Sequence, residues 1–191
     1  MTSRPIRWTR LHLRGAAIFA AGMASALGAI AAAAALALAL GLYDTRASTQ
    51  HGMFMAWATH TTFVRSVGAR ASAIPHPPPV TGAQLIAGLR QYQQDCVACH
   101  GGPGLGRAPW VSGMNPTPPY LLDAGARWTP SELYWIIAYG AKMTGMPAWR
   151  VSRSDRQIWS LVAFVEALPR IRPDVYARMA APARESPAGT P

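Results

Sequence analysis

The chain has 191 residues and a formal net charge of +10, and 17 of its 18 basic residues are arginine. Four of these arginines precede the first apolar run: Arg4, Arg7, Arg10 and Arg14. The other basic residues are scattered along the chain, whereas a nucleic-acid-binding face gathers them together. The composition therefore argues against nucleic acid as a partner and leaves room for one folded domain with additional segments.

Residues 15–43 contain no charged side chain. As a helix this stretch would measure about 43 Å, which exceeds the hydrocarbon core of about 30 Å. We predict a single transmembrane anchor over residues 15–43. The arginines before it place residues 1–14 in the cytoplasm by the positive-inside rule. The remainder then lies on the periplasmic side of a bacterial inner membrane. A cleaved signal peptide is the alternative, because "TRA" at residues 45–47 offers small residues for cleavage.

Residues 44–80 are predicted to form an amphipathic helix and a linker. Apolar residues and one histidine recur at helical spacing over residues 48–71: Met53, Trp57, His60, Val64 and Val67. This helix could lie on the membrane surface or pack against a partner subunit. His51 and His60 are nine residues apart and fall on opposite sides of a helix, so they cannot share one metal ion; His60 is interpreted as a packing residue. "IPHPPPV" at residues 74–80 is predicted to be a stiff spacer.

Three capping boxes follow the spacer, and each predicts the start of a helix. They pair Thr81 with Gln84, Thr129 with Glu132 and Ser154 with Gln157. No stretch alternates with period two for long enough to suggest a strand. We therefore predict an all-α domain over residues 81–171. Residues 172–191 are rich in Ala, Pro, Arg and Ser and are predicted to be disordered.

The two cysteines of the chain lie in "CVACH", where Cys96 and Cys99 are one helical turn apart and His100 follows directly. Cys-x-x-Cys-His is the attachment sequence of c-type haem: two thioethers form with the vinyl groups, and the imidazole binds the iron. A short disulfide, a thioredoxin-like pair and half of a zinc site fit less well. The βαβ context of thioredoxin is missing, and zinc requires a fourth ligand. We predict one covalently bound haem c.

Three segments together resemble a class I monohaem cytochrome c over about residues 81–171. They are "GLRQYQQDCVACHGGPGLGRAP", "TPSELYWIIAYGAKMTGMPAW" and "DRQIWSLVAFVEALP". The resemblance implies three main helices around the haem. It also implies that Gly88 and Tyr92 of the first helix cross Leu161 and Phe164 of the last, with glycine permitting close approach.

The resemblance implies a methionine as the second axial ligand of the iron. The candidates are Met114, Met143 and Met146. Met146 is preferred because "TGMPAW" matches the Gly-Met-Pro signature of the family, and Pro147 ends the helix and stiffens the loop. The other two methionines are interpreted as packing residues.

The second ring nitrogen of His100 needs a hydrogen-bond acceptor, and in this family a proline carbonyl supplies it. Pro109 in "GRAPW" matches the spacing of short cytochromes best, with Pro116 and Pro118 as alternatives. Arg127 and Trp128 are candidates for contact with the haem propionates.

Two axial ligands leave no open position on the iron, and a thioether ligand raises the reduction potential. The resemblance therefore implies an electron carrier and not an enzyme. Its expected partners are membrane lipid and redox proteins, namely a dehydrogenase subunit, a terminal oxidase or another cytochrome, within a respiratory complex or docked to one. The alternative is a haem enzyme of the peroxidase or sulfur-compound oxidase type.

Overall fold

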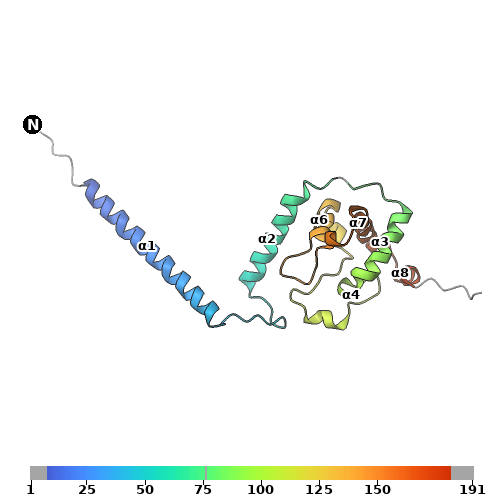
Figure 1. Cartoon of the computed structure of the whole chain (residues 1–191), viewed down its shortest axis with the longest axis horizontal. Coiled ribbons are helices and arrows are strands. Elements are labelled where there is room, and N and C mark those ends of the chain that lie inside the picture. The colour runs from blue at the N-terminus through green and yellow to red at the C-terminus, as the bar shows by residue number, and fades with distance from the viewer. Residues whose placement is uncertain (1–7, 76, 182–191) are drawn as a thin grey trace, which may run out of the picture. The chain divides into compact units, whose positions relative to one another are not determined.

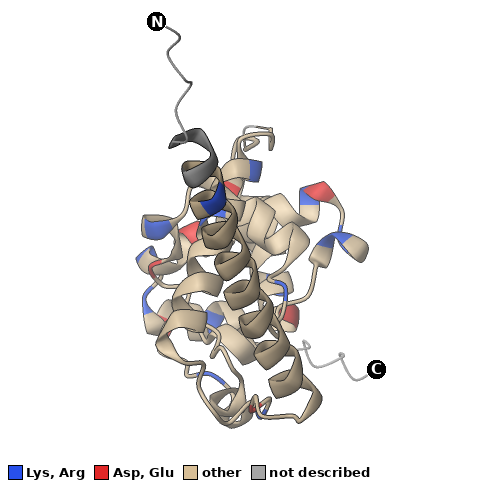
Figure 2. Cartoon of the chain, turned by 90° about the vertical axis from the view of Figure 1, so that its left-hand side faces the viewer, with Lys and Arg blue, Asp and Glu red and all other residues tan. Residues whose placement is uncertain are grey.

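The computed structural model describes residues 8–75 and 77–181 and divides the chain into two compact units, residues 1–46 and 47–191. The first unit contains one helix, α1 (Trp8–Ala39). Figure 2 shows that this helix carries no charged residue along most of its length. Residues His12–Ala39 are long and apolar enough to cross a membrane, where the sequence predicted 15–43. Part of the predicted cytoplasmic segment, residues 1–7, lies outside the described residues.

The second unit is built from helices and loops (Figure 1). Its longer helices are α2 (Met53–Ala71), α3 (Gly82–Asp95), α6 (Pro130–Tyr139), α7 (Asp155–Ala167) and α8 (Pro173–Ala180). Short turns lie between them: α4 (Val97–His100), η1 (Pro109–Gly113), α5 (Ala124–Arg127), η2 (Trp149–Val151) and η3 (Leu168–Arg170). All regular elements within the described residues are helical, so the predicted all-α class is confirmed.

The three predicted capping boxes are all formed, with both arms of each box in place. Thr81, Thr129 and Ser154 each accept a hydrogen bond from the backbone N–H three residues later. The Gln or Glu at that later position accepts one from the backbone N–H of the cap in return. These local bonds satisfy amide donors that no helix carbonyl can reach, and they fix where α3, α6 and α7 begin.

The centre of the second unit is the crossing of α3 with α7, and α6 packs against α7 beside it. At the crossing, a Cβ atom added to Gly88 would collide with the Ser160 carbonyl oxygen and lie 2.7 Å from Phe164 Cβ. The rings of Tyr92 and Phe164 pack with centroids 5.4 Å apart. The expected crossing through Gly88 and Tyr92 is therefore present, between α3 and α7. Only glycine at position 88 lets the two backbones approach this closely.

Two apolar stripes fill this interface. Leu89 and Tyr92 of α3 are buried, and the α7 stripe is buried throughout: Ile158, Leu161, Val162 and Val165. The α3 stripe covers one face of its helix, whereas α7 is buried around its whole circumference from Ser160 to Val165.

Helix α2 packs against α6, and its buried residues, Val67 and Ala71, lie in its C-terminal half. The Phe63 ring meets the Trp128 ring edge-on at 6.0 Å. The N-terminal part of the predicted apolar stripe is exposed, Met53 by 92% and Trp57 by 63%; its contact with the membrane surface or a partner subunit stays a prediction. His60 is also exposed, so its interpretation as a packing residue is wrong. The helix begins at Met53, later than the predicted residue 48.

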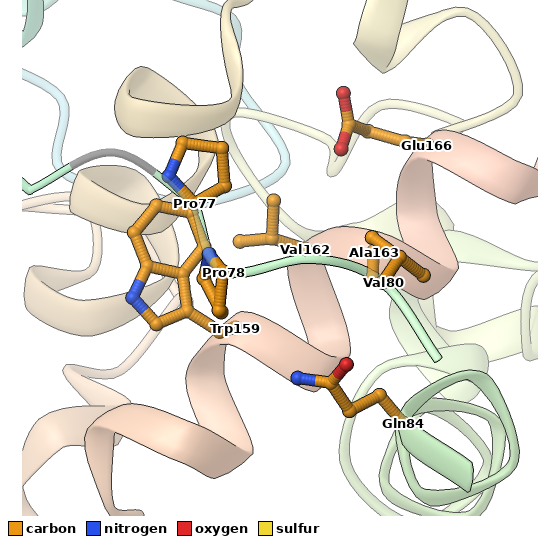
Figure 3. Close-up of a pocket in the computed structure, with 8 residues that line it drawn as sticks. All are labelled: Pro77, Pro78, Val80, Gln84, Trp159, Val162, Ala163 and Glu166. Carbon is orange, nitrogen blue, oxygen red and sulfur yellow. The ribbon is translucent and has the colours of Figure 1, made fainter. Parts of the chain in front are cut away.

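The proline-rich segment before α3 lies against α7 instead of standing free as a spacer. Figure 3 shows Pro77 and Pro78 beside Trp159. The small pocket there is lined by Pro77, Pro78, Val80, Gln84, Trp159, Val162, Ala163 and Glu166. This packing and that of α2 make residues 47–80 part of the same compact unit as the helices that follow.

The predicted disordered tail is wrong for residues 173–180, which form α8. Tyr176 is buried, and its hydroxyl oxygen accepts a hydrogen bond of 2.6 Å from Gln93 Nε2 on α3. Tyr176 is the buried residue of α8 and docks the helix against α3. Residues 182–191 lie outside the described residues.

The Gly88 contact generates a stability prediction. Gly88→Ala should lower the free energy of unfolding by about 3 kcal/mol or more, the upper end for overpacking, because the clash is with backbone. Gly82→Ala is the matched control, since Gly82 lies in the same helix with nothing within 4 Å of an added Cβ. Urea unfolding followed by circular dichroism measures both. Equal stability of the two variants would contradict the close crossing.

Candidate haem-attachment site

The Cys-x-x-Cys-His motif forms a single helical turn at the end of α3. Cys96 caps the C-terminus of α3 and precedes α4 (Val97–His100). The backbone N–H groups of Cys99 and His100 both donate to the Cys96 carbonyl, at 3.1 and 2.9 Å. Both cysteines are free thiols and half-buried. The structure therefore brings the three predicted attachment residues together within one turn.

Cys96 is held as a neutral thiol. Burial, with the neighbouring Asp95 and Cys99, raises the pKa of Cys96 to about 12, and Arg153 opposes the rise. A redox-active cysteine needs a lowered pKa, because the thiolate is the reactive species. The environment of Cys96 thus disfavours the thioredoxin-like interpretation.

The orientation of the His100 ring is fixed by one hydrogen bond, from Nδ1 to the Pro119 carbonyl oxygen at 2.7 Å. A carbonyl oxygen can only accept, so Nδ1 must carry the proton. Burial lowers the pKa of His100, the bond to Pro119 raises it, and Arg107 lowers it. The net shift is downward from 6.5, so the imidazole is neutral at pH 7 and Nε2 presents a free lone pair.

The prediction that Pro109 accepts this hydrogen bond is wrong. Pro109 opens the 3₁₀ turn η1, and its carbonyl oxygen accepts instead from Ser112 Oγ at 2.8 Å. The chain then continues through a proline-rich loop that returns Pro119 to the ring of His100. Pro116 and Pro118, the alternatives at the sequence level, are not the acceptor either. Pro119 lies in the run "PTPPY". The sequence alone does not show how this loop folds back toward His100.

The residue after His100 is confined from several sides. Gly101 has φ +66°, in the left-handed region, and a Cβ there would lie 2.7 Å from the Leu105 carbonyl oxygen and 2.8 Å from Tyr120 Cε1. Its carbonyl accepts a hydrogen bond of 2.7 Å from the buried Tyr92 hydroxyl. Tyr92 therefore links the α3–α7 crossing directly to the attachment turn. The sequence predicted Tyr92 at the helix crossing, but no pattern in it indicated this hydrogen bond to Gly101.

A partly buried ion pair joins the start of the motif to a distant loop. Arg153 Nη2 and Nε both donate to Asp95 Oδ2, at 2.7 and 3.0 Å, and the two side chains are 25% and 12% exposed. Asp95 directly precedes Cys96, whereas Arg153 follows the loop that contains Met146. The pair ties the ends of these two segments together. Nothing in the sequence pattern marked it.

Met146 lies in a tight loop after α6. Its carbonyl accepts from the Ala141 N–H at 3.3 Å, and its own N–H donates to Thr144 Oγ1 at 3.1 Å. Met146 is half-buried, whereas Met143 in the same loop is 86% exposed and has φ +61°. The third candidate, Met114, is half-buried and contacts Gly145 through its terminal methyl group.

The two propionate candidates have protein partners. Arg127 forms an exposed ion pair with Asp123, at 2.8 Å, and the Trp128 ring packs against Phe63. Neither contact assigns them to a ligand.

Residues 83–165 match a family described as "Cytochrome C oxidase, cbb3-type, subunit III". The matched segment is less than half of the chain, and it runs from the start of α3 almost to the end of α7. A search of curated proteins gave no match. The fold, the attachment turn and this match support a c-type monohaem cytochrome, as the sequence predicted. One apolar N-terminal helix supports its anchoring in a membrane.

The donor set of this site fits haem c. Two half-buried thiols lie one turn apart. The His100 imidazole donates its N–H proton to the Pro119 carbonyl, which leaves Nε2 for iron. Cys96 and Cys99 would hold the porphyrin edge, and His100 would bind the iron.

Proposed function

We propose that this protein is a membrane-anchored monohaem cytochrome that carries single electrons between periplasmic or membrane-bound redox partners. The observation that carries the proposal is the neutral His100 ring, oriented by Pro119 at the end of a Cys-x-x-Cys turn. When bound, haem c supplies an iron centre that gains or loses one electron. The residues of the chain bind this group and orient its ligand.

Met146 is the proposed second axial ligand, and three features support it. It is half-buried, its loop is fixed by two hydrogen bonds, and the competing Met143 in the same loop is exposed. A thioether in this position raises the reduction potential and closes the iron to small molecules. The ion pair of Asp95 with Arg153 ties the His100 and Met146 segments together, which favours electron transfer without rearrangement.

The proposed partners are redox proteins: a dehydrogenase subunit, a terminal oxidase or another cytochrome. The description of the matching family names a subunit of cytochrome c oxidase, which supports a terminal oxidase as the class of acceptor. Figure 2 shows basic and acidic residues scattered over the helices in view. Tethering to the same membrane as the partner would raise the local concentration of the cytochrome.

The proposed location is the inner membrane, with the haem domain in the periplasm. It is supported by the apolar helix His12–Ala39 and by the arginines that precede it in the sequence. Haem c is attached outside the cytoplasm in this arrangement, which agrees with a domain that follows the span.

The ligand assignment is tested with Met146→Ala, and Met143→Ala serves as the matched control in the same loop. Loss of the thioether should lower the reduction potential and let the reduced protein bind carbon monoxide at one per haem. Met143→Ala should behave as wild type. Redox titration and carbon monoxide difference spectra measure both effects. A wild-type protein that already binds carbon monoxide would favour a haem enzyme, and an effect confined to Met143→Ala would move the ligand there.

The anchor is tested by washing membranes with alkaline carbonate. The haem protein should stay in the membrane pellet, and protease added from the periplasmic side should cleave it. Recovery of a soluble haem protein whose chain begins near Ser48 would show instead that the apolar segment is a cleaved signal peptide.

A further inference from the structure

The segment that orients His100 has few backbone hydrogen bonds of its own. Residues 116, 118 and 119 are prolines and have no N–H to donate. Among the residues that the structure describes, none from 115 to 120 donates a backbone–backbone hydrogen bond. Side chains must therefore hold this loop in place, and through it the carbonyl of Pro119 that receives the His100 proton.

Arg107 contacts this loop at two points. Its Nη1 donates a hydrogen bond to the Pro118 carbonyl oxygen, and its guanidinium carbon lies 4.0 Å from the centroid of the Tyr120 ring. These two contacts flank Pro119, the residue between them, whose carbonyl accepts the Nδ1 proton of His100 at 2.7 Å. The half-buried Arg107 side chain thus contacts both residues that flank Pro119.

The Arg107 contacts also reach the attachment turn itself. The Tyr120 ring, held under the guanidinium, lies against Gly101, the residue directly after His100. On the other side, the N–H of Ala108, next to Arg107, donates to the Ala98 carbonyl within the motif, at 2.9 Å. The backbone that carries Arg107 is therefore fixed to the motif, and its side chain fixes the loop that faces the motif.

We propose that Arg107 is a positioning residue that holds the Pro118–Tyr120 loop and thereby sets the orientation of the His100 ring toward the iron. The inference rests on the proposed function, because it concerns the ligand to haem. Arginine suits this role and lysine does not. Its planar fork can donate to a carbonyl while its face stacks on an aromatic ring, whereas an ammonium is a compact point charge.

The test separates position from charge with two variants of the full chain, purified in detergent. Arg107→Lys keeps the positive charge and loses the fork, and Arg107→Gln loses both. The readout is the solvent-exchange rate of the His100 Nδ1 proton in the reduced protein, measured by NMR on ¹⁵N-histidine-labelled samples. Both variants should exchange about tenfold faster than wild type, the factor that corresponds to a hydrogen bond of typical net strength.

The matched control is Arg178→Gln, because Arg178 is an exposed arginine on α8 that pairs with Asp174. It should exchange at the wild-type rate. Tyr120→Leu should accelerate exchange as well, and combining it with Arg107→Gln should add little, because both changes release the same loop. Unchanged exchange in Arg107→Lys would overturn the positioning role, and so would equal acceleration in the Arg178 control.

Failure of this inference is distinguishable from failure of the proposed function. Every variant is first checked for covalently bound haem and for the wild-type far-ultraviolet circular dichroism spectrum. A wild-type chain without haem would end the proposed function. Haem-loaded variants with unchanged exchange would end only the role of Arg107. Should Arg107→Gln fail to fold, Arg107→Lys and Tyr120→Leu still decide the outcome.

Discussion

The hydrogen bond from His100 Nδ1 to the Pro119 carbonyl is the constraint on which the site depends. It commits the only proton of a neutral imidazole to one nitrogen and leaves the other as a ligand. The remaining contacts serve this arrangement. The turn of α4 places two thiols beside the ring, Tyr92 anchors Gly101 behind it, and the loop through Pro119 supplies the acceptor.

The fold explains how a turn of four residues can be held so firmly. Helix α3 crosses α7 at Gly88, and this close approach buries Tyr92, whose hydroxyl continues into the attachment turn. The ion pair of Asp95 with Arg153 adds a second link, from the start of the motif to the end of the Met146 loop. Packing and hydrogen bonding thus connect the two segments that would supply the proposed iron ligands His100 and Met146.

The sequence predicted features that depend on neighbouring residues, but not contacts between segments that lie far apart in the chain. The three capping boxes and the attachment motif depend on residues within four positions of one another, so spacing alone fixes them. The acceptor of the His100 proton depends on how the loop after η1 folds back toward the ring. The prediction of Pro109 was therefore wrong, and Pro119 was not predicted. Helix α2 shows the same limit, because periodicity indicates an apolar face, but only tertiary contact shows which part of that face the chain covers. Tyr176 shows that one buried aromatic side chain can dock a segment that was predicted to be disordered.

Cys96, Cys99 and His100 are proposed to form the attachment site for one haem c. This assignment can be tested by denaturing the protein, extracting it with acidified acetone and recording a pyridine haemochrome spectrum of the pellet. We expect haem to stay with the polypeptide, at one per chain, with the spectrum of a haem linked through two thioethers. Haem that passes into the acetone, or a pellet without haem, would contradict it.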